Sequence, residues 1–195
     1  MNKRKETQTL TRMSIMAAII IMFHIMAQYT SNVLSTSINL SLVALAICAI
    51  TFGYKGALIL SGVSGLTTVV MGIVGFDKFT NILFNAQPVA TIAICMVKIM
   101  AAAVVCTFLY KLLCKKNEFL AVIVASLAVP VVNTGLFILG GLTIVSKTLT
   151  TEFVAEGTTL IHFVLITCCL INFTLEFSLN AILSPAIKRI SKLLK

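Results

Sequence analysis

Two ionisable side chains lie deep within apolar stretches of this 195-residue sequence, where their charge needs a partner. Lys98 lies in ATIAICMVKIMAAAVV, and Glu176 lies in INFTLEFSLN. A charged group in hydrocarbon is costly, so each is a candidate functional residue. Three interpretations of Lys98 stay open: it binds an acidic group of a small molecule, it pairs with Glu176, or it faces a water-filled cavity without a ligand.

The depths of the two charges differ. At about 1.5 Å per helical residue, Lys98 lies roughly 14 Å from one end of its apolar stretch, and Glu176 lies about 12 Å further along. We therefore expect Glu176 to have a structural role outside the site of Lys98. Arg12 and Lys55 are its candidate partners.

Polar groups on two other apolar stretches lie at the estimated depth of Lys98. In PVVNTGLFILGG, Pro130 interrupts the helical hydrogen bonds, and Asn133 and Thr134 follow it. Asn172 begins a polar stripe at helical spacing that continues through Glu176 to Asn180. The pattern favours a polar pocket at which three helices converge. The alternative is that the amides only join neighbouring helices.

Several kinds of chemistry lack the residues that they require. His24 and His162 lie in different apolar stretches, without acidic or cysteine partners at useful spacing, and the six cysteines lack metal-ligand spacing. There is no Ser-His-Asp order and no glycine-rich nucleotide loop. We expect no enzymatic activity, no metal and no cofactor, and we expect any ATP-driven step to occur on a partner.

The elements that must position these residues are membrane-spanning helices. The chain is 59% hydrophobic and 11% charged, far from the roughly 25% charged residues of a soluble domain. Apolar stretches of about twenty residues recur. We predict an all-α, six-transmembrane-helix bundle forming a single integral membrane domain over residues 1–195. The predicted spans are 11–29, 37–53, 56–75, 89–113, 119–145 and 159–184.

Basic residues predict the orientation of the bundle. An even number of spans puts both termini on one side, and most of the 15 Lys and Arg residues fall on that side. They are residues 3, 4, 5, 12, 55, 111, 115, 116, 188, 189, 192 and 195. We therefore expect both termini in the cytoplasm of a multi-pass protein of the cell membrane. Topology and anionic lipid account for the net charge of +9, so no nucleic acid is expected.

Several of these stretches resemble the substrate-binding (S) component of energy-coupling factor (ECF) transporters, which take up vitamins in bacteria. AITFGYKGALILSGVSGL is similar to the family's glycine-rich connection between helices 2 and 3. FNAQPVATIAICMVKI resembles its loop into helix 4, with a basic residue at Lys98. VPVVNTGLFILG and INFTLEFSLNAILSPAIKRI resemble its helices 5 and 6.

The resemblance implies a six-helix bundle whose ligand site lies in the outer half, between helices 4 to 6, under the outer loops. It also implies partners: one transmembrane coupling protein and two ATPase subunits. Small residues of the family's first helix dock on the coupling protein, and Ser14, Ala17 and Ala18 are their nearest match here. Met22 replaces the next small residue of that pattern.

The substrate implied is a small vitamin-like molecule. Pantothenate suits one buried cation with amide groups nearby, whereas folate calls for more positive charge. A flat heteroaromatic such as riboflavin would stack on Phe137 or Phe173. We expect Lys98, Asn133, Thr134, Asn172 and Phe137 to line the substrate site. The other functions considered are a ligand-free structural or assembly protein and a stand-alone carrier.

Overall fold

Long apolar helices dominate the computed structural model of this chain, which describes residues 3–34, 39–154 and 157–194. These residues form helices and no strand. Five helices are long and apolar enough to cross a membrane. They are α1 (Lys3–Leu34), α2 (Ser41–Ile73), α4 (Pro88–Leu113), α5 (Glu118–Thr143) and the stretch Leu160–Leu194. The predicted all-helical fold is confirmed, and the five long apolar helices support the predicted membrane-protein character.

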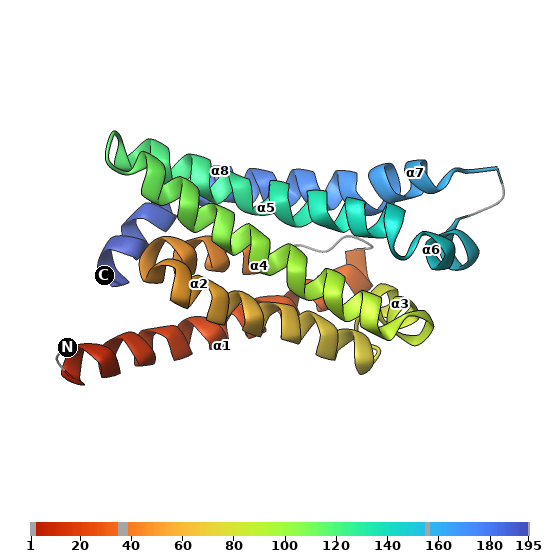
Figure 1. Cartoon of the computed structure of the whole chain (residues 1–195), viewed down its shortest axis with the longest axis horizontal. Helices are drawn as coiled ribbons and strands as arrows, with labels where there is room; N and C mark the ends of the chain where they lie inside the picture. The colour runs from red at the N-terminus through yellow and green to blue at the C-terminus, as the bar shows by residue number, and fades with distance from the viewer. Residues whose placement is uncertain (1–2, 35–38, 155–156, 195) are drawn as a thin grey trace.

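The predicted spans 37–53 and 56–75 correspond to the one helix α2, which begins at Ser41, ends at Ile73 and is broken at Gly53. Residues 37 and 38 of the first span lie outside the described residues. The backbone there has φ 66° and ψ −161°, a region that is essentially open to glycine alone. Figure 1 shows α2 turning back on itself in its first half. A Cβ atom on Gly56 would lie 2.2 Å from the Cβ of Phe52. Two glycines therefore permit the tight reversal.

The first half of α2 forms the centre of the main core. Every residue from Ser41 to Ile50 is buried, which explains why this segment is apolar on all sides. It packs with buried residues of α1, α4, α5 and α8 (Ile171–Leu194), among them Ile20, Cys106, Val122 and Ile187. Small side chains, such as those of Ala44 and Ala46, let the surrounding helices approach closely.

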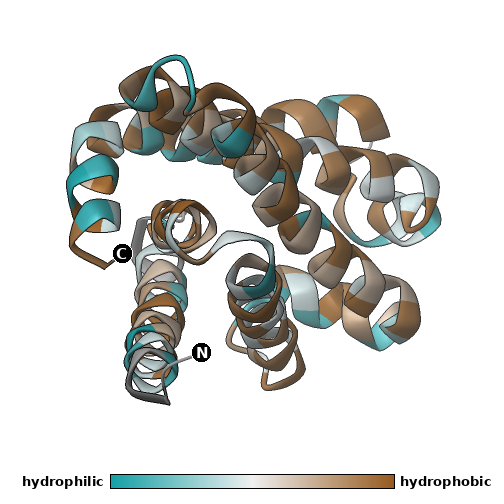
Figure 2. Ribbon diagram, turned by 60° about the vertical axis from the view of Figure 1, so that its left-hand side comes forward, coloured by the Kyte–Doolittle hydropathy of each residue, from teal (hydrophilic) through white to brown (hydrophobic). Residues whose placement is uncertain are grey.

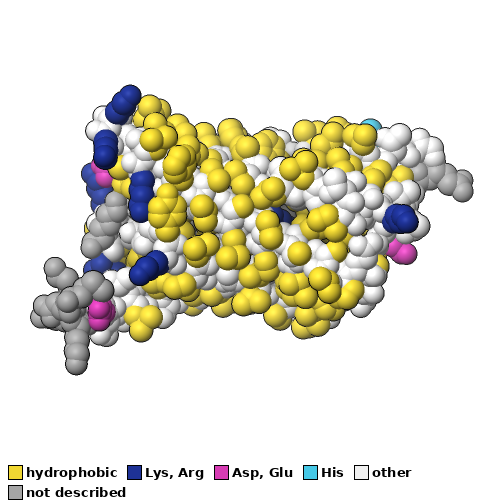
Figure 3. Space-filling model, in the orientation of Figure 1, with side chains coloured by type: hydrophobic (Ala, Val, Ile, Leu, Met, Phe, Trp, Pro, Cys, Tyr) yellow, Lys and Arg dark blue, Asp and Glu magenta, His cyan; other side chains and the backbone are white. Residues whose placement is uncertain are grey.

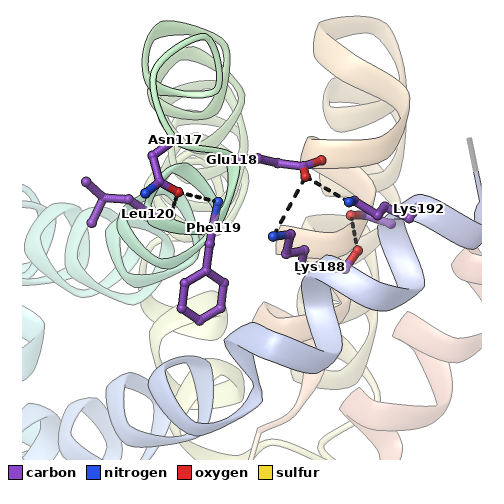
Figure 4. A network of polar contacts seen from close by, with 7 residues as sticks. Asn117, Glu118, Phe119, Leu120, Lys188 and Lys192 are labelled. Carbon is purple, nitrogen blue, oxygen red and sulfur yellow. Dashed lines mark hydrogen bonds and ion pairs between the residues drawn. The ribbon is translucent and has the colours of Figure 1, made fainter.

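The chain ends lie at the same end of the bundle, as Figure 1 shows. Basic side chains gather at that end in Figure 3, and we call it the basic end. Apolar colour dominates the long helices in Figure 2. The basic end is tied together by Glu118 at the start of α5, whose carboxylate lies 2.9 Å from Lys192 and 3.8 Å from Lys188 of α8 (Figure 4).

Two short helices cover the opposite end of the bundle. α3 (Lys78–Ala86) begins at Asp77, whose side chain accepts a hydrogen bond from the Thr80 backbone N–H. α6 is Ser146–Phe153. Gln87, the residue that follows α3, donates through Nε2 to Thr148 Oγ1 of α6 at 3.0 Å. This hydrogen bond connects the two short helices. The N-cap Asp77 was a readable signal for α3.

Candidate functional site

A cavity of about 340 Å³ lies within the bundle. Its wall comes from α1, α2, α3, α4, α5, α8 and the π-helical segment η1 (Phe163–Leu170) that precedes α8. A volume of this size falls within the range of small-molecule sites, roughly 300–1,000 Å³. Figure 3 shows a hollow midway along the drawn face, with the dark blue of a basic side chain inside it.

All five residues predicted to bind substrate line this one cavity. Lys98 comes from α4, Asn133, Thr134 and Phe137 come from α5, and Asn172 comes from α8. The three α5 residues share a face because they lie within about one turn of each other. α5 continues through Pro130 as a single helix. The convergence of three helices expected from the sequence is thus present in the structure.

The Lys98 ammonium lies against an aromatic ring. Its Nζ is 5.1 Å from the centroid of the Phe137 ring, which is within cation–π range. The ion pairs found among the described residues are those of Glu118 at the basic end. Lys98 therefore has no carboxylate within 4 Å in the described part of the chain. An anionic group of a ligand can occupy the space beside it.

Glu176 lies in the cavity wall, whereas we expected it to lie outside the site of Lys98. It is 8% exposed. Within the described residues, neither of its expected partners, Arg12 and Lys55, forms an ion pair with Glu176. Arg12 Nη1 instead donates to the Leu194 backbone oxygen at 2.7 Å. Depth counted along a single helix could not show that Glu176 faces the same space as Lys98. That relation depends on how the helices pack.

α1 and α2 build a polar wall of the cavity that was not predicted from the sequence. His24 Nε2 lies 2.8 Å from Ser64 Oγ, and both residues line the cavity. Gln28 and Thr68 line it one turn further along the same two helices. The i, i+4 spacing of each pair was visible in the sequence. The pairing of the two stripes across helices was not.

Ser41 is a further missed wall residue, at the start of α2. It is fully buried, and its Oγ has no hydrogen-bond partner. Its backbone N–H donates to Asn39 Oδ1 at 2.9 Å. A buried hydroxyl without a partner costs free energy unless a ligand or water satisfies it. Ser41 therefore offers a polar group to whatever occupies the cavity.

Phenylalanines close the cavity toward α3 and α6. The Phe79 ring lies 4.9 Å from that of Phe153 and 6.0 Å from that of Phe137, between centroids. Phe153 stacks on Phe163 at 5.8 Å. These rings come from four different elements, so the cluster joins both short helices to the cavity wall. The Phe137 ring thus contacts both this cluster and Lys98.

The helix that carries Asn172 and Glu176 begins with a π-helical segment. η1 follows the short α7 (Leu160–His162) and precedes α8. Its residues Thr167, Cys168 and Cys169 line the cavity. Wide π turns are frequent at functional sites, because they change which side chains face inward. The periodicity of the sequence carried no signal for this segment.

The residues expected to dock on a coupling protein lie on the outer surface of α1. Ser14 and Ala18 are exposed and Ala17 is half-buried. The Ser14 hydroxyl donates to the Leu10 carbonyl of its own helix at 3.0 Å. Met22 continues the same face and is 47% exposed. The face is accessible, and a larger side chain interrupts its row of small residues.

Comparisons with protein-family models, with curated proteins and with solved structures found no match to this chain.

Proposed function

We propose that this chain is the substrate-specificity (S) component of an ECF-type importer and binds a small, acidic, vitamin-like molecule. The observation that carries the proposal is the cavity, in which Lys98 has no ion-pair partner among the described residues and polar groups surround it. Lys98 binds the acidic group of the ligand, and Asn133, Thr134 and Asn172 orient it. Phe137 packs against the body of the ligand.

The proposed topology has six crossings, with both termini in the cytoplasm. The two segments of α2 on either side of Gly53 count separately, as the reversal in Figure 1 supports. The basic end then faces the cytoplasm of a bacterium, in keeping with the preference for Lys and Arg on that side. α3 and α6 lie at the outer surface, over the ligand.

The proposed partners are a transmembrane coupling protein and two ATPase subunits. The exposed face of α1 around Ser14 and Ala18 supplies the docking surface, with Ala17 at its edge. Exposed small residues let a second helix approach closely within a membrane.

The two alternative functions are less well supported. A ligand-free structural protein would use Lys98 and Glu176 as a packing pair, and no ion pair joins these two described residues. A stand-alone carrier needs a polar path through the membrane. The buried segment from Leu42 to Ile50 instead fills the bundle between the cavity and the basic end with apolar side chains.

Native mass spectrometry of the protein purified from bacterial membranes tests the proposal. We expect one small organic molecule bound per chain and released on denaturation. Lys98→Met should be purified with much less of it, whereas Lys111→Met, at the basic end of the same helix, should keep it. A wild-type protein that retains no molecule, even after incubation with a cell extract, would contradict the proposed function.

A further inference from the structure

We propose that the ligand of the cavity is amphoteric, carrying an acidic group that binds Lys98 and a basic nitrogen that donates to Glu176. The inference rests on the proposed function and narrows its ligand from an acidic molecule to one with both charges. It also gives Glu176 a direct role in choosing the ligand.

The Glu176 carboxylate lies at the cavity without a hydrogen-bond or ion-pair partner among the described residues. The residue is 8% exposed and lines the cavity. The hydrogen bond that Glu176 makes uses its backbone oxygen, which accepts from Asn180 Nδ2 at 2.9 Å. No hydrogen bond or ion pair to its carboxylate is found among the described residues. A buried carboxylate needs donors, because water no longer solvates it.

Asp77 and His24, the other acidic and basic side chains in the cavity wall, have hydrogen-bond partners. Asp77 accepts from the Thr80 backbone N–H at 3.2 Å and from the Thr80 hydroxyl at 2.6 Å. His24 is hydrogen-bonded to Ser64. The wall therefore holds one ammonium, Lys98, and one carboxylate, Glu176, and no ion pair within 4 Å joins either of them to the other or to another charged group of the described residues.

Opposite charges held apart in one small cavity select for a ligand with the complementary arrangement. An electrostatically complementary molecule satisfies both groups, whereas one that matches a single group leaves the other buried and unpaired. Pantothenate, which has a carboxylate and no basic nitrogen, would satisfy Lys98 and leave Glu176 without an opposite charge. A purely cationic molecule would do the reverse.

The surroundings of the two charges indicate the rest of the ligand. The Phe137 ring lies beside Lys98, and Phe173 lines the cavity between Asn172 and Glu176 along the same helix. The ligand body is therefore a ring or a short carbon chain that packs on aromatic faces. A cavity of about 340 Å³ limits the ligand to a small molecule.

The first experiment identifies the ligand class with wild-type protein alone. Purified protein in detergent is incubated with a hot-ethanol extract of bacterial metabolites and, separately, with pantothenate. The retained compound is released and analysed by tandem mass spectrometry. We expect a compound with an acidic group and a basic nitrogen, and no retention of pantothenate. Retention of a purely acidic compound would overturn the inference and leave the proposed function standing. Retention of nothing would overturn both.

The second experiment asks whether Glu176 meets the basic nitrogen. The retained compound and its N-acetylated derivative, which has lost the basic charge, are titrated calorimetrically into wild type and Glu176→Gln. For wild type, acetylation should lower the affinity ten- to a hundredfold, as expected for loss of a charge-assisted hydrogen bond. For Glu176→Gln, the unmodified compound should bind that much more weakly, and acetylation should then have little further effect.

The controls separate a direct contact from a loss of structure. Glu118→Gln removes a carboxylate at the basic end, outside the cavity wall, and should leave the affinity unchanged. Glu176→Asp keeps the charge with a shorter reach and should lose less affinity than Glu176→Gln. If Glu176→Gln does not fold, Glu176→Asp takes its place in the titrations. Equal losses on acetylation in wild type and in the Glu176 variant would overturn the contact.

Discussion

At the scale of single residues, the Lys98 ammonium lies beside an aromatic ring and has no ion-pair partner among the described residues. The Phe137 ring lies 5.1 Å away, and no ion pair reaches Lys98 within the described residues. If it binds the acidic group of the ligand, Lys98→Met should weaken binding roughly ten- to a hundredfold, because a charge-assisted hydrogen bond is worth about 1.5–3 kcal/mol. Lys98→Arg should lose less. Calorimetric titration with the co-purified ligand measures both.

A matched control is available on the same helix. Lys111 lies with its Nζ 4.2 Å from the centroid of the Tyr54 ring, at the basic end of α4. It is about 20 Å from Lys98 at 1.5 Å per residue. Lys111→Met should leave the affinity unchanged. Unaltered binding by a folded Lys98→Met protein would remove Lys98 from the site.

At the scale of elements, the reversal within α2 depends on Gly53. Its φ of 66° and ψ of −161° belong to a region that costs other residues about 1–3 kcal/mol. A Cβ at this position would meet nothing closer than the Lys111 side chain at 3.8 Å, so the cost lies in the backbone. Gly53→Ala should lower the free energy of unfolding by that amount, measured by denaturant unfolding in detergent.

Gly62 supplies the comparison for this prediction. It lies in the second half of α2, and a Cβ there would have nothing within 4 Å. Gly62→Ala should be neutral or stabilise the protein by up to about 1 kcal/mol, because alanine is the better helix former. Equal effects of the two substitutions would show that the break at Gly53 does not require glycine.

The exposed face of α1 carries the prediction about assembly. If Ser14 and Ala18 form the close contact with a coupling protein, Ala18→Leu should prevent the complex from forming, because the added side chain separates the helix backbones. Ligand binding by the isolated chain should remain. Ala93→Leu makes the same change on an exposed position of α4 and should assemble normally. Co-purification of the variant Ala18→Leu with an intact complex would argue against this face.

At the scale of the whole molecule, we propose that this chain binds the ligand and that its partner subunits supply the energy for uptake. The sequence has no phosphate-binding glycine loop, and the cavity is the proposed ligand site. Proteoliposomes that contain this chain alone should bind ligand without accumulating it, even with ATP inside. Adding the coupling protein and ATPases should start accumulation. ATP-driven uptake by the chain alone would contradict the proposed division of labour.

The sequence by itself determined most of the helices of the bundle and many residues of the candidate site. Apolar stretches of helical length predicted α1, α4, α5 and the last long helix to within several residues at most ends. Chain-length counting placed Lys98, Asn133 and Asn172 at one depth, because rise per residue is nearly constant along a helix. The structure brings these three residues to one cavity.

Only the tertiary structure decided which helix faces meet. It brought the His24 and Ser64 stripes together, turned Glu176 toward the same space as Lys98, and made the first half of α2 a buried central element. Rotation of a helix about its axis and the pairing of distant helices depend on packing among all neighbours, and local periodicity carries neither. The presence of Lys98 and Glu176 in one cavity, on which the proposed ligand class depends, is therefore a property of the fold.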